Sequence, residues 1–264
     1  MTNENRMSDN TSIFWSGRLI CHGHTGWSDP VVYAYDQLER LELIKSAILK
    51  IPSKDGEALD FGCGTGDFSK LLLSLGYTVC GYDPFVEPSV DSEKFHYAYT
   101  YKGISIEKHS AKLALSVTAL DHILDQSEFD TALAAIRSCL CAGGAFLMLE
   151  YALDSINDRE RFKLKNDYQA FRTVEQWQES LGRNQFRVLE ISPAPHPAFN
   201  PTFEYIAYSR SLLVKILRRL ASLPTNRFWL IPMLKMVAAK YIPNVFTLLG
   251  SKNSPLKLIH AVAV

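Results

Sequence analysis

The sequence predicts an α/β protein built around a mostly parallel sheet, and three observations carry this prediction. Residues 58–61 follow a polar turn and have the length and apolar character of a buried parallel strand. Glycines then alternate through residues 62–66, and apolar residues recur at helical spacing over 68–75. A second apolar stretch, 77–82, ends at Asp83. The order strand, glycine loop, helix and strand is typical of a nucleotide-binding unit.

The carboxylates around the glycine loop indicate which ligand it suits. Asp83 follows the loop by about twenty residues, where a carboxylate can accept hydrogen bonds from both hydroxyls of a nucleoside ribose. A dinucleotide site needs Gly or Ala three positions after Gly64, but Asp67 stands there and would repel a pyrophosphate. Asp60, at the end of the first strand, would suit a cationic amino group. The pattern favours a nucleoside with a positive, phosphate-free tail, such as S-adenosylmethionine, over NAD.

Two motifs carry a resemblance to a known family. Asp60-Phe-Gly-Cys-Gly-Thr-Gly66, followed by Gly81-Tyr-Asp-Pro84, resembles motif I and the next acidic motif of the class I S-adenosylmethionine-dependent methyltransferases. Residues 113–122 and 141–150 are similar, more loosely, to the fourth and fifth strand regions of that family, so that about half of the chain is covered. The resemblance implies a Rossmann-like, mostly parallel seven-stranded sheet with an antiparallel last strand. It also implies S-adenosylmethionine as methyl donor and S-adenosylhomocysteine as product.

The carboxyl ends of the strands define the expected site, because ligands of a doubly wound sheet bind there. Residues 112–117 read as the fourth strand, which places its last residues near the methionine part of the cofactor. His122 is expected at the substrate mouth as a catalytic base, or else merely starts the next helix. Glu150 and Tyr151, after the fifth strand, are further candidates to line the acceptor site. The residues expected to bind the cofactor are Asp60, Gly62, Cys63, Gly64, Gly66, Asp83, Pro84, Val117 and Thr118.

Residues 1–55 are expected to form a loop and a helix that cover the cofactor site. Asp29 and Pro30 predict the start of this helix, whereas residues 13–27 read as irregular. Aromatic residues here could shield the sulfonium, because aromatic faces attract cations. His22 and His24, with Asp29, make a poor metal site at this spacing, so no metal is predicted. The aromatic candidates for shielding are Trp27, Tyr33 and Tyr35.

The formal net charge of zero hides an asymmetry. Residues 211–264 contain eight Lys or Arg and no Asp or Glu, so the preceding residues hold the other 20 basic residues and all 28 acidic ones. The five cysteines form no C-x-x-C pair, and the polar N-terminus has no secretory signal, which predicts a reduced, cytoplasmic location. No apolar run is long enough for a membrane span.

The C-terminal region is expected to carry an insertion on the cofactor-binding core of residues 56–202. Residues 203–243 read as a helical cap before a final strand at 245–250, within a last segment of 244–264. Apolar and basic residues lie on different faces of the helix after Ser211. This helix is either a packed cap or a surface, 211–241, that contacts a lipid-linked acceptor or a membrane.

The predicted function is methyl transfer from S-adenosylmethionine to a small-molecule or lipid-linked acceptor at oxygen. A nucleic-acid partner is disfavoured, because no binding module is appended and no Asn-Pro-Pro-Tyr or Asp-Pro-Pro-Tyr follows the fourth strand. Two alternatives stay open. One is an RNA methyltransferase that uses the basic C-terminal region, and the other is a cofactor-binding protein without transferase activity.

Overall fold

The computed structural model describes residues 9–52, 55–161, 168–196, 211–223, 227–239 and 254–264. The chain divides into two compact units. The core unit comprises Met1–Thr25, Lys45–Ser192 and Lys257–Val264. The helical unit comprises Gly26–Ile44 and Pro193–Leu256.

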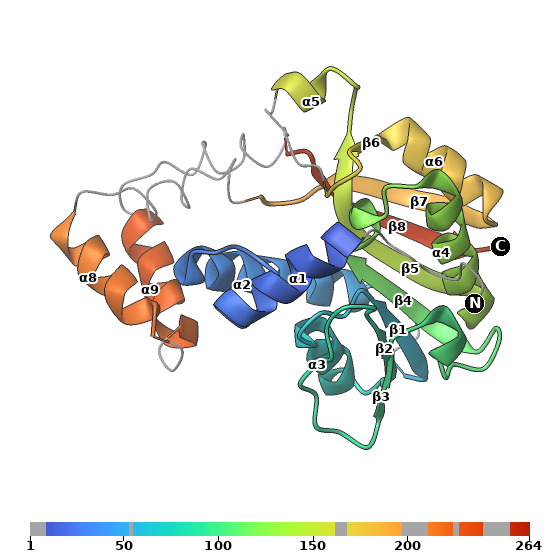
Figure 1. Cartoon of the computed structure of the whole chain (residues 1–264), viewed down its shortest axis with the longest axis horizontal. Helices are drawn as coiled ribbons and strands as arrows, with labels where there is room; N and C mark the ends of the chain where they lie inside the picture. The colour runs from blue at the N-terminus through green and yellow to red at the C-terminus, as the bar shows by residue number, and fades with distance from the viewer. Residues whose placement is uncertain (1–8, 53–54, 162–167, 197–210, 224–226, 240–253) are drawn as a thin grey trace. The chain divides into compact units, whose positions relative to one another are not determined.

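A twisted sheet organises the core unit (Figure 1). Its described strands follow the order β3-β2-β1-β4-β5-β8-β7, and the short β6 pairs with β5. Neighbours from β3 through β5 are parallel, whereas β7 and β8 are antiparallel, which confirms the predicted Rossmann-like fold. The strands are β1 (Glu57–Phe61), β2 (Thr78–Tyr82), β3 (Phe95–Ala98), β4 (Ala111–Val117), β5 (Leu140–Leu153), β6 (Arg172–Thr173), β7 (Phe186–Pro193) and β8 (Leu256–Ala263).

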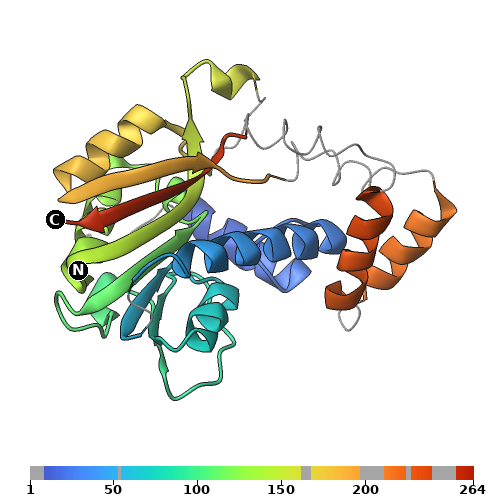
Figure 2. The same cartoon turned by 180° about the vertical axis from the view of Figure 1, so that it is seen from behind.

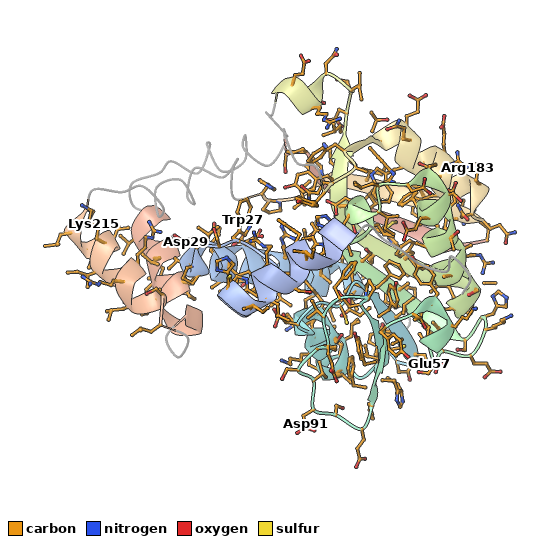
Figure 3. All side chains as sticks on the ribbon, viewed as in Figure 1. Trp27, Asp29, Glu57, Asp91, Arg183 and Lys215 are labelled. Atoms are coloured by element: carbon orange, nitrogen blue, oxygen red, sulfur yellow. The ribbon has the colours of Figure 1, made fainter. Side chains whose placement is uncertain are left out.

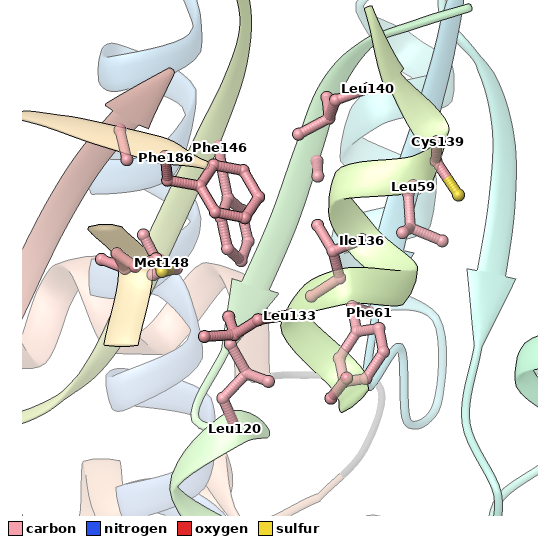
Figure 4. Packing of buried hydrophobic residues seen from close by; sticks show 14 of the residues in the cluster. Leu59, Phe61, Leu120, Leu133, Ile136, Cys139, Leu140, Phe146, Met148 and Phe186 are labelled. Carbon is pink, nitrogen blue, oxygen red and sulfur yellow. The ribbon is translucent and has the colours of Figure 1, made fainter. Parts of the chain in front are cut away.

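Helices α4 and α6 pack on this sheet through one apolar cluster. Figure 4 shows Leu133 of α4 beside Leu120, within the same buried cluster as Ile136 of α4 and the strand residues Leu59 and Phe61. Trp177 of α6 is fully buried and donates its indole N–H to the Tyr151 carbonyl over 2.9 Å. The helices of this unit are α1 (Asp9–His22), α3 (Asp67–Ser74), α4 (Gln126–Cys139), α5 (Asp158–Arg161) and α6 (Val174–Arg183), with 3₁₀ turns at Tyr101–Gly103 and Leu120–His122.

The helical unit has its own apolar core. Helix α2 (Pro30–Ile48) begins in this unit, and α8 (Leu212–Ala221) and α9 (Arg227–Ala239) complete it (Figure 2). Tyr35 of α2 packs with Val214 and Leu217 of α8 and with Ile231 of α9. Among the described residues, no helix is both long enough and apolar enough to cross a bilayer.

The predicted start of α2 is confirmed. The Asp29 carboxylate accepts hydrogen bonds from the N–H groups of Val31 and Val32, at 2.9 and 3.1 Å, which satisfies donors that the first helical turn leaves unpaired. The same side chain pairs with Arg218 of α8. Asp29 therefore holds two helices of the helical unit together and is not a free metal ligand.

Two other predictions differ from the structure. The prediction that residues 13–27 are irregular is wrong for residues 13–22, because they lie in α1, which extends to His22. The last strand is β8, whose residues alternate between buried and partly exposed positions. The predicted strand at 245–250 lies outside the described residues. Residues 142–144 lie within β5, where the register against β4 shifts.

Replacing Thr173 with Ala tests the capping box of α6. The Thr173 hydroxyl accepts from the Gln176 N–H over 3.2 Å, and the Gln176 amide oxygen accepts from the Thr173 N–H over 2.8 Å. Losing this cap should lower the free energy of unfolding by about 1 kcal/mol in urea denaturation. The control Thr131→Ala lies within α4, and its hydroxyl bonds only back to the Ser127 carbonyl. Equal destabilisation by both changes would contradict the capping account.

Candidate functional site

The loop after β1 has an open side for a ligand. Gly62, Gly64 and Gly66 all have left-handed backbone angles, with φ of 78, 51 and 87°. A Cβ at Gly62 would lie 2.1 Å from the Ala119 Cβ, and one at Gly66 would lie 2.4 Å from the Val90 Cγ2. At Gly64 the nearest atom is the Thr25 Oγ1 at 3.6 Å. Packing therefore demands glycine at the outer two positions, whereas Gly64 leaves the loop accessible.

Asp83 holds this loop in place. Its Oδ2 accepts the Gly64 N–H over 3.0 Å, and its Oδ1 accepts the N–H groups of Phe85 and Val86 at 2.9 Å. Burial raises the pKa of the carboxyl, while these three donors favour its charged form. A carboxylate has about four acceptor positions, so Oδ2 retains capacity for one more donor. A ribose hydroxyl is a donor of the required kind.

Asp60 makes the floor of the site acidic. Its side chain is 1% exposed and accepts the Ser69 hydroxyl over 2.6 Å. Burial, with Asp83 and Asp67 nearby, raises the pKa of Asp60 to about 7. A cation beside Asp60 would stabilise its charged form, whereas a phosphate would add repulsion. The structure thus retains the charge pattern that argued against a dinucleotide.

Cys63 and Pro84 contribute less than their motif positions indicate. The Cys63 thiol is buried, which raises its pKa, and the Cys63 N–H is used by the Tyr82 carbonyl at 2.9 Å. Cys63 therefore contributes to the site through the path of its backbone and not through its thiol. Pro84 is exposed directly after Asp83.

The loop after β4 forms the other side of the site. Thr118 has φ of 48°, an unusual value for a β-branched residue, and its N–H donates to the Leu149 carbonyl over 2.8 Å. Val117 and Thr118 are both partly exposed. Held strain of this kind is typical of ligand-binding positions.

Glu150 anchors this loop, a role that the sequence did not reveal. Its Oε1 accepts the Ser116 hydroxyl at 2.7 Å and the N–H groups of Ala119 and Leu120 at 3.1 and 3.2 Å. Burial and the nearby Asp121 raise the pKa of Glu150 to about 8. Its side chain is fully buried and its oxygens bond to this loop, so Glu150 positions the loop, and its place in the acceptor site stays a prediction. With the Asp121 N–H on Oε2 at 3.3 Å, three amides bond to this one carboxylate, an arrangement of tertiary structure that an acid at a strand end does not reveal in the sequence.

His122 is held in one tautomer. Its Nδ1 lies 2.6 Å from the Tyr168 carbonyl, which can only accept, so Nδ1 carries a proton and Nε2 has the lone pair in the neutral ring. Nε2 lies 3.5 Å from the Asp121 Oδ1. Burial lowers the pKa of His122, opposed by the Tyr168 carbonyl and Glu150. The side chain is 13% exposed, so part of it is accessible to solvent.

The segment around Tyr168 closes over the loop after β4. The Gln169 amide donates to the Asp121 Oδ2 over 3.0 Å, and the Ala170 N–H donates to the Asp121 carbonyl over 2.7 Å. The guanidinium of Arg172 is buried, lies over the Phe129 ring and donates to the Ile123 carbonyl over 2.7 Å.

Helix α1 supplies the remaining wall. Phe14 stacks on Tyr168 with ring centroids 4.3 Å apart, and Trp15 meets the His122 ring edge-on at 4.5 Å. Farther along, Arg18 donates to the Thr25 carbonyl over 3.0 Å, and Thr25 borders Gly64. The N-terminal segment therefore contacts both the glycine loop and the His122 loop.

The aromatic residues expected to shield the sulfonium and the histidines considered as metal ligands have other surroundings. Trp27 (Figure 3) donates its indole N–H to Asp36 over 2.8 Å. Tyr35 is part of the apolar core of the helical unit. His22 and His24 lie with their rings 6.0 Å apart. Across the described ranges, no three His, Cys, Asp or Glu residues are grouped to hold a metal ion.

A profile of the family described as "Methyltransferase domain" matches residues 33–191, more than half of the chain. The chain belongs to this methyltransferase domain family. The match includes the glycine loop, Asp83, the end of β4 and Glu150. The protein is an S-adenosylmethionine-dependent methyltransferase, which confirms the cofactor and reaction class expected from its motifs.

Solved structures resemble the methyltransferase over most of its length. They include a chain of the complex between the Haloferax volcanii Trm112 methyltransferase activator and the putative methyltransferase, with 14% identity, a TM-score of 0.56, and coverage of 98% of this chain and 99% of that chain. Another is phosphoethanolamine N-methyltransferase 2 of Haemonchus contortus, with 19% identity, a TM-score of 0.55, and coverage of 95% and 60%.

A third is the Burkholderia thailandensis 1,6-didemethyltoxoflavin-N1-methyltransferase, with 17% identity, a TM-score of 0.51, and coverage of 74% and 86%. At these identities the likeness concerns the fold alone. None of the curated proteins matches the sequence significantly.

Replacing Gly64 with Ala tests whether the open side of the loop receives the donor. Overpacking costs about 1–3 kcal/mol, so S-adenosylmethionine should bind roughly 5- to 150-fold more weakly in isothermal titration. Gly143→Ala is the matched control, because Gly143 also has positive φ with nothing within 4 Å of an added Cβ. Both variants incur the same backbone cost in stability. Equal donor affinity in the two variants would contradict this placement of the ligand.

Proposed function

We propose that the methyltransferase transfers a methyl group to an oxygen of a small-molecule or lipid-linked acceptor, with His122 as the base that takes the acceptor's proton. The observation that carries this proposal is the tautomer of His122. Its protonated Nδ1 faces the Tyr168 carbonyl, so the lone pair is on Nε2. A hydroxyl acceptor needs such a base, because it must lose a proton as the new bond to carbon forms.

The donor supplies a methyl group on a sulfonium, which is already activated by its charge. Asp83 would accept one ribose hydroxyl at Oδ2, and Asp60 would face the donor's amino group. Gly62, Gly64 and Gly66 bring the backbone close, and Val117 and Thr118 would lie beside the methionine part. Cys63 and Pro84 complete the loops through their backbone. Alignment of donor and acceptor then supplies much of the rate enhancement.

The surroundings of His122 suit a base that works near neutral pH. Its lowered pKa keeps the ring neutral, so that Nε2 can accept a proton. Asp121 lies 3.5 Å from Nε2 and would stabilise the charged ring after transfer. Trp15 and the Tyr168 segment limit access of water, which favours transfer to the acceptor. The expectation that residues 1–55 cover the cofactor site is part of this proposal.

The names of two structural neighbours point to a nitrogen acceptor as the alternative to oxygen. The Haemonchus contortus enzyme is named for N-methylation of phosphoethanolamine, and the Burkholderia thailandensis enzyme for methylation at N1 of 1,6-didemethyltoxoflavin. A neutral amine already carries a lone pair and needs no strong base. The geometry of His122 favours oxygen for this chain. A lipid-linked acceptor would be met at a bilayer, for which residues 211–241 are the suited region.

Replacing His122 with Gln should slow single-turnover methyl transfer roughly 100- to 10,000-fold, the usual contribution of a general base. The acceptor panel would comprise sugar hydroxyls, phenols, quinols and amines, with radiolabelled donor. His96→Gln is the control, because His96 is an exposed histidine on β3. Donor affinity, measured by titration, should be unchanged in both variants.

The pH dependence gives a second readout of His122. A base acts when unprotonated, so the wild-type rate should rise with pH and level off above an apparent pKa below the ordinary 6.5. This step should be absent from His122→Gln. An unchanged rate in that variant would overturn the role of His122. Turnover that requires RNA would support the RNA alternative.

A further inference from the structure

Helix α8 has two apolar faces, and only one of them is used for packing. Val214, Leu217 and Ala221 are buried in the core of the helical unit. On the other side of the helix, apolar residues recur at spacings of three and four and are 43–54% exposed. These residues, here called the outer stripe, are Leu213, Ile216, Leu220 and Leu223. Leu212, next to the stripe, is 73% exposed.

Exposed apolar residues continue on the neighbouring helix. In α9, Ile231 and Leu234 are buried, whereas Met233 and Met236 are 49% and 68% exposed. Single exposed apolar residues are ordinary, whereas several on two helices that share a core are typical of an interaction surface.

Cations border the outer stripe. Lys215 and Arg219 are exposed on α8, and Figure 3 shows Lys215 extending away from the helix. Arg218 is paired with Asp29 and therefore contributes less free charge. The sequence has no Asp or Glu after Glu204, so residues 211–264 contain no acidic side chain that could neutralise these cations. An apolar helical face bordered by lysine and arginine is the pattern of helices that lie in the interface of an anionic bilayer.

A second copy of the chain fits this surface less well. A twofold-symmetric contact would place the same patch against itself and bring the cations of both copies together. An RNA would satisfy the cations but leave the leucines exposed. An anionic lipid surface satisfies both, because its headgroups attract the cations and its acyl boundary takes up the apolar side chains.

We propose that the outer stripe of α8, with Lys215 and Arg219, docks the methyltransferase on an anionic lipid bilayer. The helix would lie along the interface with its leucine and isoleucine side chains in the acyl boundary. This surface goes beyond the methyl-transfer chemistry and does not depend on the identity of the acceptor. It would bring the enzyme to lipid-linked substrates.

Vesicle co-sedimentation of the full chain tests the apolar part. Vesicles of phosphatidylcholine with a third of phosphatidylglycerol should bind the wild type, and phosphatidylcholine alone should bind it much more weakly. The double change Leu213→Gln with Leu220→Gln should weaken binding about tenfold or more, because each side chain loses apolar burial. The control, Leu124→Gln with Leu189→Gln, alters two leucines of the core unit that are each 51% exposed and should bind like the wild type.

A second pair of variants tests the charges. Lys215→Gln with Arg219→Gln should lose on the order of tenfold in affinity, because each cation near an anionic surface contributes about 1 kcal/mol. The control, Lys70→Gln with Lys94→Gln, removes two exposed lysines of the core unit and should leave binding unchanged. Donor affinity should be the same in all four variants, which separates this test from that of methyl transfer.

Three results would overturn the proposal. One is no binding to anionic vesicles, and another is equal loss in the stripe variants and their controls. The third is that the surface binds a different partner and that no binding to vesicles is seen. Analytical ultracentrifugation would show a dimer lost in Leu213→Gln with Leu220→Gln if a second copy covers the stripe. Binding to a single-stranded RNA, lost in Lys215→Gln with Arg219→Gln, would assign the cations to nucleic acid.

Discussion

The carboxylate of Asp83 is the interaction on which the ligand edge of the sheet depends. It gathers N–H groups from two different loops, that of Gly64 after β1 and those of Phe85 and Val86 after β2. A buried carboxylate is costly unless donors surround it, so these loops are stable in this arrangement only together. Glu150 does the same for the loop after β4. Two buried acids thereby fix the three loops that a donor and an acceptor would contact.

The same acids limit the choice of ligand. Asp60, Asp67 and Asp83 lie around one glycine loop, and burial together with the other two acids raises the pKa of Asp60. Such a site discourages phosphates and favours a ligand with positive charge, and S-adenosylmethionine carries a sulfonium and an amino group. Methyl transfer then requires little from the protein beyond alignment, exclusion of water and, for oxygen acceptors, a base. In the proposed reaction His122 is that base, because the Tyr168 carbonyl leaves the lone pair of its neutral ring on Nε2.

Local signals made part of this architecture predictable. The strand, glycine loop and acid before Pro84 specify β1, α3 and β2, and Asp29 specifies the start of α2. Helix α1 was missed because aromatic residues and a central Gly17 weaken its helical pattern. The position of β8 was missed because its second residue is a buried lysine, Lys257, whose charge is met by Asp154 at 3.2 Å. Contacts between distant segments, such as Glu150 with the β4 loop and Tyr168 with His122, have no local signature.

The burial of α8 could not be predicted either. The spacing of its apolar residues shows that the helix is apolar over a wide arc, but not which part of that arc is buried.

The most direct test of the central claim is thermal stabilisation of the wild type and Asp83→Ala by S-adenosylmethionine, S-adenosylhomocysteine and NAD. A ligand at a hundredfold excess over its dissociation constant stabilises the folded state by about 2.7 kcal/mol. We expect a clear shift of the wild type with both adenosyl ligands and none with NAD. Asp83→Ala should still fold, but the same ligand concentrations should raise its melting temperature less. The variant loses both the acceptor for a ribose hydroxyl and the anchor of the Gly64 N–H. Absence of any shift with the adenosyl ligands, or a shift that Asp83→Ala leaves unchanged, would contradict the site described for this chain.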